Sequence, residues 1–305
     1  MEHMRGFVTI ATGNERYFRL ARNLLYSYRQ FAKNPCPFAI ITDRENKYTQ
    51  EFDKVIVIPD PHNSYMDKLK LFRDIPFQET IFIDADSLAY GDLNIWWDMF
   101  SSMGDFSLFG YAWRDLGTDR GWFTWDGMKE YKDRISFVPS FNGGVYYMRK
   151  TPICEKVFSI ANHAARNYLD YAFNGFSNAA DEPVLALGMA VCGCEPLNLS
   201  EIAFAPKRNK IEADISVPTA FYKRNPENTY PVNLIHWSTY LTRKSLYRFE
   251  VSKLMRIRNN PEYLESLKYK ILYEWKVLYR LMYIYEFSAF FSRVSSKLKK
   301  NIRKN

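Results

Sequence analysis

Apolar residues in the first half of the chain fall into short blocks that predict buried strands, separated by segments with helical spacing. The apolar blocks cover residues 5–12, 37–42, 54–58 and 80–84, and weaker ones cover 106–112, 141–148 and 233–236. Apolar residues three to four positions apart predict helices over 15–31, 64–73, 151–169 and 181–191. Buried strands that alternate with helices are typical of a mostly parallel sheet with helices on both faces. The sequence therefore predicts an α/β fold.

Composition and charge divide the chain into two parts. Apolar residues make up 47% of the chain and charged residues 25%, which excludes a disordered chain. The net charge is +8, but residues 241–305 alone carry 16 Lys and Arg against 5 Asp and Glu, so the rest is slightly acidic. We therefore expect a catalytic domain over residues 1–245 and a helical basic tail over 246–305.

The expected location follows from what the sequence lacks. Four cysteines in 305 residues do not suggest a disulfide framework, and this favours a reducing compartment. No apolar run reaches the ~18–20 residues that a membrane span requires, and a predicted strand begins too early to leave room for a leader peptide. We expect a cytoplasmic protein.

The basic tail predicts contact with a membrane surface. Tyr, Trp and Phe alternate there with Lys and Arg, and apolar residues from Leu264 to Tyr285 follow helical spacing. Such a helix can lie on an anionic membrane, here the inner face, with its aromatic rings at the headgroups. The alternative is a helix packed on the catalytic domain. We expect no nucleic-acid partner, because no recognition motif accompanies the charge.

The strongest chemical signal is a pair of aspartates at the end of a predicted strand. The apolar run Ile81-Phe82-Ile83 leads directly into Asp84-Ala85-Asp86. A lone pair with this spacing is common in solvated turns, but two carboxylates at the mouth of a buried strand are costly without a balancing positive charge. The pattern favours a site for a hard divalent cation.

Three further motifs lie at predicted element ends. Phe141-Asn142-Gly143-Gly144 is either a hairpin turn or a place where a ligand approaches the backbone. In Asp181-Glu182-Pro183 we expect Asp181 to cap a helix, which leaves Glu182 free to face a site. His236 ends the last predicted strand, where it is either a structural residue or a ligand.

Together, and in this order, these motifs resemble the family 8 glycosyltransferases, the group that includes glycogenin and lipopolysaccharide galactosyltransferases. The resemblance covers about residues 5–240. It implies a GT-A fold, with a Rossmann-like, mixed and mostly parallel sheet. It further implies a nucleotide-sugar donor, usually UDP-linked, and a Mn²⁺ ion, with Mg²⁺ as the alternative.

The resemblance also implies roles for particular residues. The metal ligands would be Asp84, Asp86 and His236. The donor-binding residues would be Ala11, Thr12, Tyr17, Lys68, Asp84, Ala85, Gly143 and Gly144, with the first three at the uracil and ribose. The residues near the transferred sugar would be Asn142, Asp181 and Glu182.

The chain departs from the family pattern at three places. Gly143 replaces an Ala, and Glu182 stands where the family often has Gln. After His236 the family's Gly and Lys-Pro-Trp are missing, so Arg243 and Lys244 become the candidates for the cation that binds the diphosphate.

Three functions remain open at this point. The first is a metal-dependent glycosyltransferase that acts with retention on a glycan or lipid-linked acceptor, with Glu182 as nucleophile or as hydrogen-bond partner of the sugar. The second is a sugar-phosphate nucleotidylyltransferase, although the loop Thr12–Arg16 is poorly suited to bind a triphosphate. The third is an inactive, membrane-docked module that binds a sugar nucleotide.

Overall fold

The computed structural model describes residues 4–175, 178–198, 202–204, 211–217, 219–225 and 228–260, together with Ile271 and Trp275. The chain divides into two compact units, Met1–Thr239 and Tyr240–Asn305. The predicted boundary after residue 245 stays a prediction. Among the described residues, no helix has both the length and the apolar character needed to cross a membrane.

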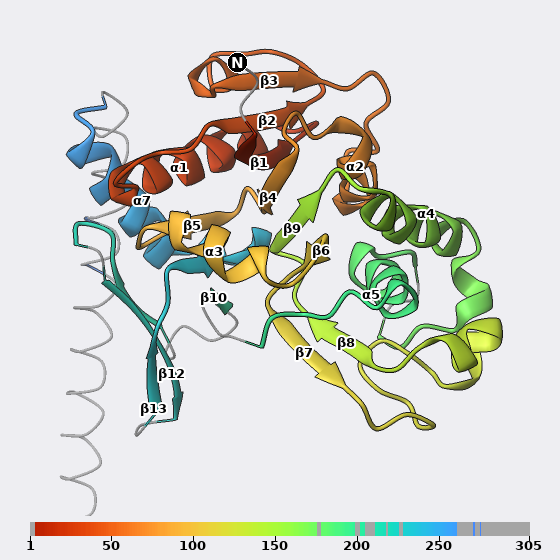
Figure 1. The fold of residues 1–305 in the computed structure, drawn as a ribbon. Coiled ribbons are helices and arrows are strands. Elements are labelled where there is room, and N and C mark those ends of the chain that lie inside the picture. The colour runs from red at the N-terminus through yellow and green to blue at the C-terminus, as the bar shows by residue number, and fades with distance from the viewer. Residues whose placement is uncertain are drawn as a thin grey trace, which may run out of the picture. The chain divides into compact units, whose positions relative to one another are not determined.

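A six-stranded sheet forms the centre of the first unit, in the order β3-β2-β1-β4-β9-β6 (Figure 1). Its strands are β1 (Arg5–Ala11), β2 (Phe38–Thr42), β3 (Lys54–Val57), β4 (Glu79–Ile83), β6 (Phe106–Ser107) and β9 (Val145–Arg149). The first four are parallel neighbours, whereas β9 runs antiparallel to both β4 and β6. The predicted mostly parallel α/β sheet is therefore confirmed.

Helices cover both faces of this sheet. Successive residues of a strand point to opposite faces, so neighbouring residues of β1 pack against different helices. Phe7 of β1 points to one side, where its ring lies 4.7 Å from that of Tyr28 and 5.1 Å from that of Trp97. Val8 points to the other side and joins the core formed by α4 and α5. The helices of the unit are α1 (Glu15–Phe31), α2 (Leu71–Asp74), α3 (Trp96–Ser101), α4 (Pro152–Arg166) and α5 (Asp181–Cys192).

Three smaller sheets complete the first unit. They are β10-β14-β5 (Ile202–Phe204, Leu234–His236 and Ser87–Ala89), β11-β12-β13 (Ile211–Asp214, Thr219–Asn225 and Asn228–Pro231) and β7-β8 (Gly110–Trp113 and Val138–Phe141). The first of these matters most for the site. Antiparallel pairing of β14 with β5 places His236 opposite Ser87, directly after the two aspartates.

Several predicted elements differ from the structure. The strand expected over 106–112 is two strands in different sheets, and that expected over 141–148 is broken by a turn at residues 142–144. The helix expected over 64–73 is the 3-10 helix η2 (Tyr65–Lys70) followed by one turn of α2. Residues Asp126–Arg134 form the 3-10 segment η4. The other 3-10 turns are η1 (Thr49–Glu51), η3 (Leu93–Ile95) and η5 (Tyr168–Tyr171).

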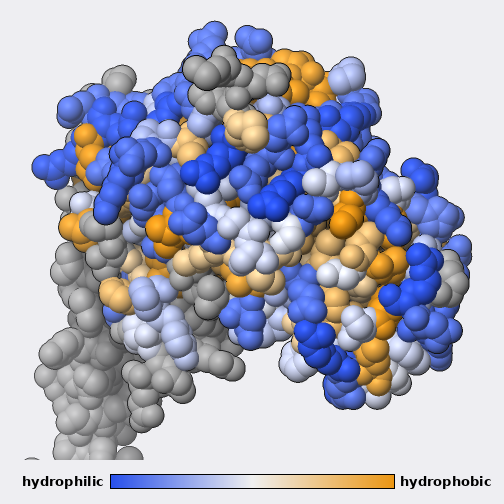
Figure 2. Space-filling view, viewed as in Figure 1, coloured by the Kyte–Doolittle hydropathy of each residue, from blue (hydrophilic) through white to orange (hydrophobic). Residues whose placement is uncertain are grey.

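The second unit begins within α6 (Ser238–Leu241) and continues with α7 (Ser245–Ile257). In α7, Tyr247, Leu254 and Met255 are buried, and Lys253 forms an ion pair of 2.7 Å with Glu250 one turn earlier. Of the predicted basic tail over 246–305, the described residues are 246–260, Ile271 and Trp275. The rest lies outside the described residues. Where residues are described, the face shown in Figure 2 is mostly polar, with small apolar patches.

Candidate active site

The residues singled out at strand ends converge beside β4. Asp84 follows the last residue of β4, and its backbone N–H donates a 2.9 Å hydrogen bond to the carbonyl of Gly144 in the turn between β8 and β9. The N–H of Trp237, just after β14, donates to the carbonyl of Asp86 at 3.1 Å. Backbone hydrogen bonds thus join the two-aspartate turn to the glycine turn and to the end of β14.

Asp84, Asp86 and His236 form a cluster of three side chains that could hold a metal ion. One ligand atom from each lies within 4.8 Å of the other two. Nε2 of His236 is 3.0 Å from Oδ1 of Asp86 and 3.7 Å from Oδ2 of Asp84. All three side chains are less than one-fifth exposed. The two carboxylates are therefore held close together and are largely shielded from water.

The surroundings of His236 fit a divalent cation. Nδ1 lies 3.0 Å from Oδ1 of Asn142. Amide and carboxylate oxygens can only accept, so in the metal-free protein the imidazole donates from Nδ1 to Asn142 and from Nε2 to Asp86. Loss of the Nε2 proton would leave a lone pair directed at a cation between the carboxylates. Gly144 allows this fit, since a Cβ there would lie 2.8 Å from Nδ1 of His236. Two carboxylates and one imidazole oriented by a hydrogen bond are a common donor set for such an ion.

Electrostatics couple these three groups. Burial would lower the pKa of His236, but the hydrogen bond and the charge of Asp86 outweigh it and raise the pKa above 6.5. Burial would likewise raise the pKa of Asp86, but the hydrogen bond with His236 outweighs it and lowers the pKa. The imidazole proton therefore compensates the carboxylate, as a bound cation would.

Lys68 is a buried cation that links two parts of the site. Its ammonium contacts Oδ2 of Asp84 at 2.9 Å and Oδ2 of Asp181 at 3.0 Å, and it donates to the carbonyl of Gly143 at 2.9 Å. Three partners match the three N–H donors of a lysine. Burial opposes the charge, but the two carboxylates outweigh it and raise the pKa of Lys68. Lys68 therefore stays charged.

Asp181 and Glu182 face the glycine turn from the first turn of α5. The expectation that Asp181 caps this helix is wrong, because Ala180 occupies the N-cap position. The Asp181 carboxylate instead accepts a 2.9 Å hydrogen bond from the hydroxyl of Tyr146, in addition to its contact with Lys68. Oε1 of Glu182 accepts a 2.6 Å hydrogen bond from the N–H of Gly143, and burial raises the pKa of Glu182.

A cavity of about 390 Å³ opens beside the two aspartates. It is lined by Ile10, Ala11, Thr12, Tyr17, Asn63, Ser64, Tyr65, Lys68, Asp84, Ala85, Asp86 and Thr239. The lining therefore contains the predicted donor-binding residues from the end of β1 and the start of α1. It also contains the ion pair between Lys68 and Asp84.

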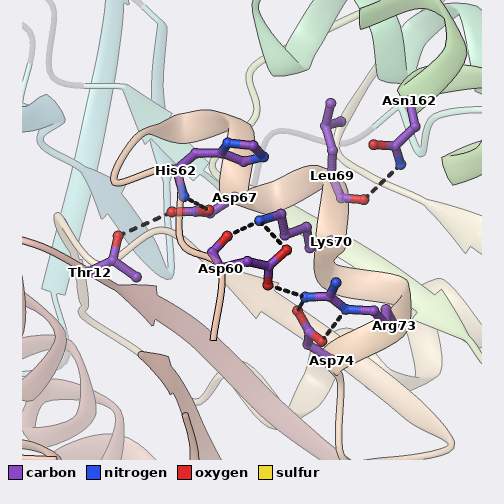
Figure 3. A network of polar contacts seen from close by, with 9 residues as sticks. All are labelled: Thr12, Asp60, His62, Asp67, Leu69, Lys70, Arg73, Asp74 and Asn162. Carbon is purple, nitrogen blue, oxygen red and sulfur yellow. Dashed lines mark hydrogen bonds and ion pairs between the residues drawn. The ribbon is translucent and has the colours of Figure 1, made fainter. Parts of the chain in front are cut away.

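Asp67 holds Thr12, one of the residues that line this cavity, and Figure 3 shows the contact. The buried Asp67 carboxylate accepts hydrogen bonds from the hydroxyl of Thr12 at 3.2 Å and from the backbone N–H of His62 at 2.7 Å. The same figure shows Lys70 and Arg73 reaching Asp60 at the start of this loop, with ion pairs of 3.0 and 3.2 Å. The segment between Asp60 and Asp67 is thus held near both of its ends.

Of the site residues proposed from the sequence, those at the end of β1 and in α1, Lys68 and those of the two-aspartate turn line the cavity, and His236 joins the cluster. The others do not line the cavity but contact these residues or one another: Asn142, Gly143, Gly144, Asp181 and Glu182. Arg243 and Lys244 belong to the second unit. Sequence reasoning missed Tyr146, Asp67 and Thr239. Tyr146 stands only two residues after the glycine pair and Thr239 three after His236, so proximity to a motif was the available signal. Asp67 gave no signal of its own.

Comparisons with known proteins show the fold. No protein-family model and no curated protein matches the chain. Among solved structures, the bifunctional glycosyltransferase WbbM aligns at a TM-score of 0.53 and 11% identity, over 88% of this chain and 52% of WbbM. Galactosyltransferase LgtC, in complex with donor and acceptor sugar analogs, aligns at 0.47 and 15%, over 82% of this chain and 94% of LgtC. Mouse xyloside xylosyltransferase 1 aligns at 0.47 and 13%, over 77% and 98%.

The chain thus spans about half the length of WbbM. The likeness to WbbM shows that the chain shares the fold of that protein, and the expected GT-A fold is confirmed.

Proposed function

We propose that the chain is a glycosyltransferase that moves a sugar from a UDP-sugar to a glycan or lipid-linked acceptor, with Mn²⁺ as its cofactor. The observation that carries this proposal is the cluster of Asp84, Asp86 and His236 at the edge of a cavity, within a GT-A fold. Retention of the anomeric configuration, which the family resemblance implies, is part of the proposal.

Asp84, Asp86 and His236 would hold the cation. Imidazole is a better ligand for Mn²⁺ than for Mg²⁺, so the donor set favours Mn²⁺. When bound, the ion would supply Lewis-acid stabilisation of the negative charge that develops on the diphosphate leaving group. The orientation of His236 by Asn142 prepares the imidazole for this role before any ligand arrives.

The cavity would bind the nucleoside. Ala11, Thr12 and Tyr17 line it at the carboxyl end of β1, which is where open α/β sheets bind their ligands. The tyrosine ring offers a flat apolar surface, and the threonine hydroxyl is held by Asp67. These residues would place the diphosphate beside the two aspartates.

Asp181, Glu182 and the glycine turn would surround the transferred sugar. Lys68 keeps Asp84 and Asp181 at a fixed separation, because its ammonium contacts both carboxylates. Glu182 already accepts a hydrogen bond from the N–H of Gly143. This contact favours Glu182 as a group that orients the sugar and the turn, rather than as a nucleophile.

The proposed membrane contact rests on the charge, the aromatic residues and the helical spacing of the tail sequence. Beyond residue 260 only Ile271 and Trp275 belong to the described residues. We keep an anionic membrane surface as a proposed partner. Peripheral attachment at the inner face of a membrane would bring the active site to a lipid-linked acceptor.

The proposal is tested by measuring nucleotide release from a panel of nucleotide sugars without acceptor. We expect slow hydrolysis of one UDP-sugar with Mn²⁺ and none with a chelator. Asp86→Asn should lower this rate by about 100-fold or more, since it weakens the binding of the charge-stabilising ion. Asp98→Asn, on the exposed face of α3, is the matched control and should leave the rate unchanged.

Two results would contradict the proposal. One is the absence of release from every donor, together with no thermal stabilisation by UDP and Mn²⁺. The other is near-normal turnover by a folded Asp86→Asn variant, which would remove the metal assignment.

A further inference from the structure

The two oxygens of the Asp86 carboxylate have different partners. Oδ1 faces Nε2 of His236 at 3.0 Å, within the proposed metal cluster. Oδ2 accepts a 3.1 Å hydrogen bond from the hydroxyl of Thr239. A carboxylate held through one oxygen cannot rotate freely about its χ2 angle, so the hydroxyl keeps Oδ1 directed toward the imidazole.

Thr239 reaches Asp86 because the chain turns sharply after β14. Ser238 has a φ of 56°, a left-handed conformation that is costly for a residue other than glycine. Two backbone contacts keep this turn in place. The N–H of Trp237 donates to the carbonyl of Asp86 at 3.1 Å, and the guanidinium of Arg16 donates to the carbonyl of Thr239.

We propose that Thr239 is a positioning residue for the cation site, which acts by orienting the Asp86 carboxylate before the metal binds. This inference rests on the proposed function, because it assumes that Asp86 is a metal ligand. The strained turn at Ser238 has a role in this arrangement, since it directs the threonine hydroxyl back toward the aspartate. Hydrogen-bond partners of metal ligands typically contribute about 10- to 100-fold to metal affinity or activity.

The test measures Mn²⁺ binding directly, without a donor sugar, by the electron paramagnetic resonance signal of the free ion. Thr239→Val keeps the shape of the side chain and removes the hydroxyl, and we expect it to weaken Mn²⁺ binding by about 10-fold. Thr239→Ser keeps the hydroxyl and should bind within about 3-fold of the parent protein. Thr239→Ala also deletes the hydroxyl but carries neither γ-methyl group of valine.

Two controls separate positioning from other roles. Thermal unfolding of the metal-free variants should stay close to that of the parent, which shows that the fold is intact. Because Thr239 also lines the cavity, UDP binding is measured without Mn²⁺ as well. A positioning role leaves this metal-free affinity unchanged, whereas a direct contact with the nucleotide would lower it and overturn the inference.

Other outcomes also decide the question. If Thr239→Val binds Mn²⁺ as tightly as the parent, or if Thr239→Ser binds as weakly as Thr239→Val, the hydroxyl has no positioning role. In both cases the proposed function stands. If the parent protein itself binds no Mn²⁺, the proposed metal site fails, and the role of Thr239 fails with it.

Discussion

Replacing Gly144 by alanine should damage the proposed metal site while leaving the fold intact. A Cβ at this position would lie 2.8 Å from Nδ1 of His236 and 3.3 Å from Oδ1 of Asn142. Ordinary contact begins near 3.4 Å, so the imidazole would have to withdraw by about 0.6 Å. The ring is confined on its other side by the carboxylates of Asp84 and Asp86, at 3.7 and 3.0 Å from Nε2.

The size of the effect follows from the hydrogen bond that this shift disturbs. The Nδ1 contact with Asn142 is 3.0 Å long and sets the orientation of the imidazole. Loss of such a partner should weaken Mn²⁺ binding by about 10- to 100-fold, which corresponds to about 1.4 to 2.8 kcal/mol. The added methyl group should also cost about 1–3 kcal/mol of stability, as overpacking does elsewhere.

The neighbouring glycine provides a matched comparison. A Cβ on Gly143 would meet the hydroxyl of Tyr146 at 2.5 Å and Oδ2 of Asp181 at 3.1 Å, so it disturbs the proposed sugar side of the site rather than the imidazole. We expect Gly143→Ala to keep Mn²⁺ affinity within about 3-fold and to lose turnover. Calorimetric titration with Mn²⁺ distinguishes the two variants. A folded Gly144→Ala protein that binds Mn²⁺ like the parent would refute the reasoning.

Two further predictions concern charge. Lys68→Met would leave the carboxylates of its partners buried without a cation and should lower the free energy of unfolding by about 3–5 kcal/mol in urea titrations. Lys70→Met, which removes a contact with the half-exposed Asp60, should cost about 1 kcal/mol or less, and equal losses would contradict this explanation. The pKa of His236 is raised above 6.5, so its contribution to metal-free stability is fully present below pH 6.5 and is lost as pH rises through the raised pKa. The melting temperature of metal-free protein should therefore fall over that window more steeply than that of His236→Asn, and parallel pH profiles would count against it.

The sequence predicts the elements that local pattern determines. Helix α1 begins at Glu15 and ends at Phe31 as its apolar spacing predicts, and the four parallel strands lie within a residue or two of the apolar blocks. Strands whose partners lie far away in the sequence could not be predicted from the local pattern. Residues 106–113 form one apolar run, yet β6 pairs with β9 in the central sheet and β7 pairs with β8 outside it. Nothing local to the run indicates that change of partner.

The same division holds within the site. Asp84 and Asp86 follow β4 of the central sheet, and His236 ends β14, which pairs with β5 in a smaller sheet. All three were identifiable because they stand at the ends of apolar runs. The partners that orient them were not. Thr239 meets Asp86 only because Ser238 adopts a left-handed conformation, and Asp67 meets Thr12 only because η2 packs beside the end of β1. These contacts depend on backbone geometry that residue type alone does not specify.

Two residues at which the sequence departs from the resemblance, Gly143 and Glu182, contact each other in the structure. The family motif has Ala where this chain has Gly143 and often has Gln where it has Glu182. Here the Glu182 carboxylate lies 2.6 Å from the N–H of Gly143, while a Cβ on that glycine would approach Cγ of Glu182 to 3.1 Å and the hydroxyl of Tyr146 to 2.5 Å. The close approach of the acid therefore requires the glycine. An ionised Glu can only accept hydrogen bonds, and the N–H of Gly143 supplies a donor to it. The two departures therefore meet in one contact, the hydrogen bond from the Gly143 N–H to the Glu182 carboxylate.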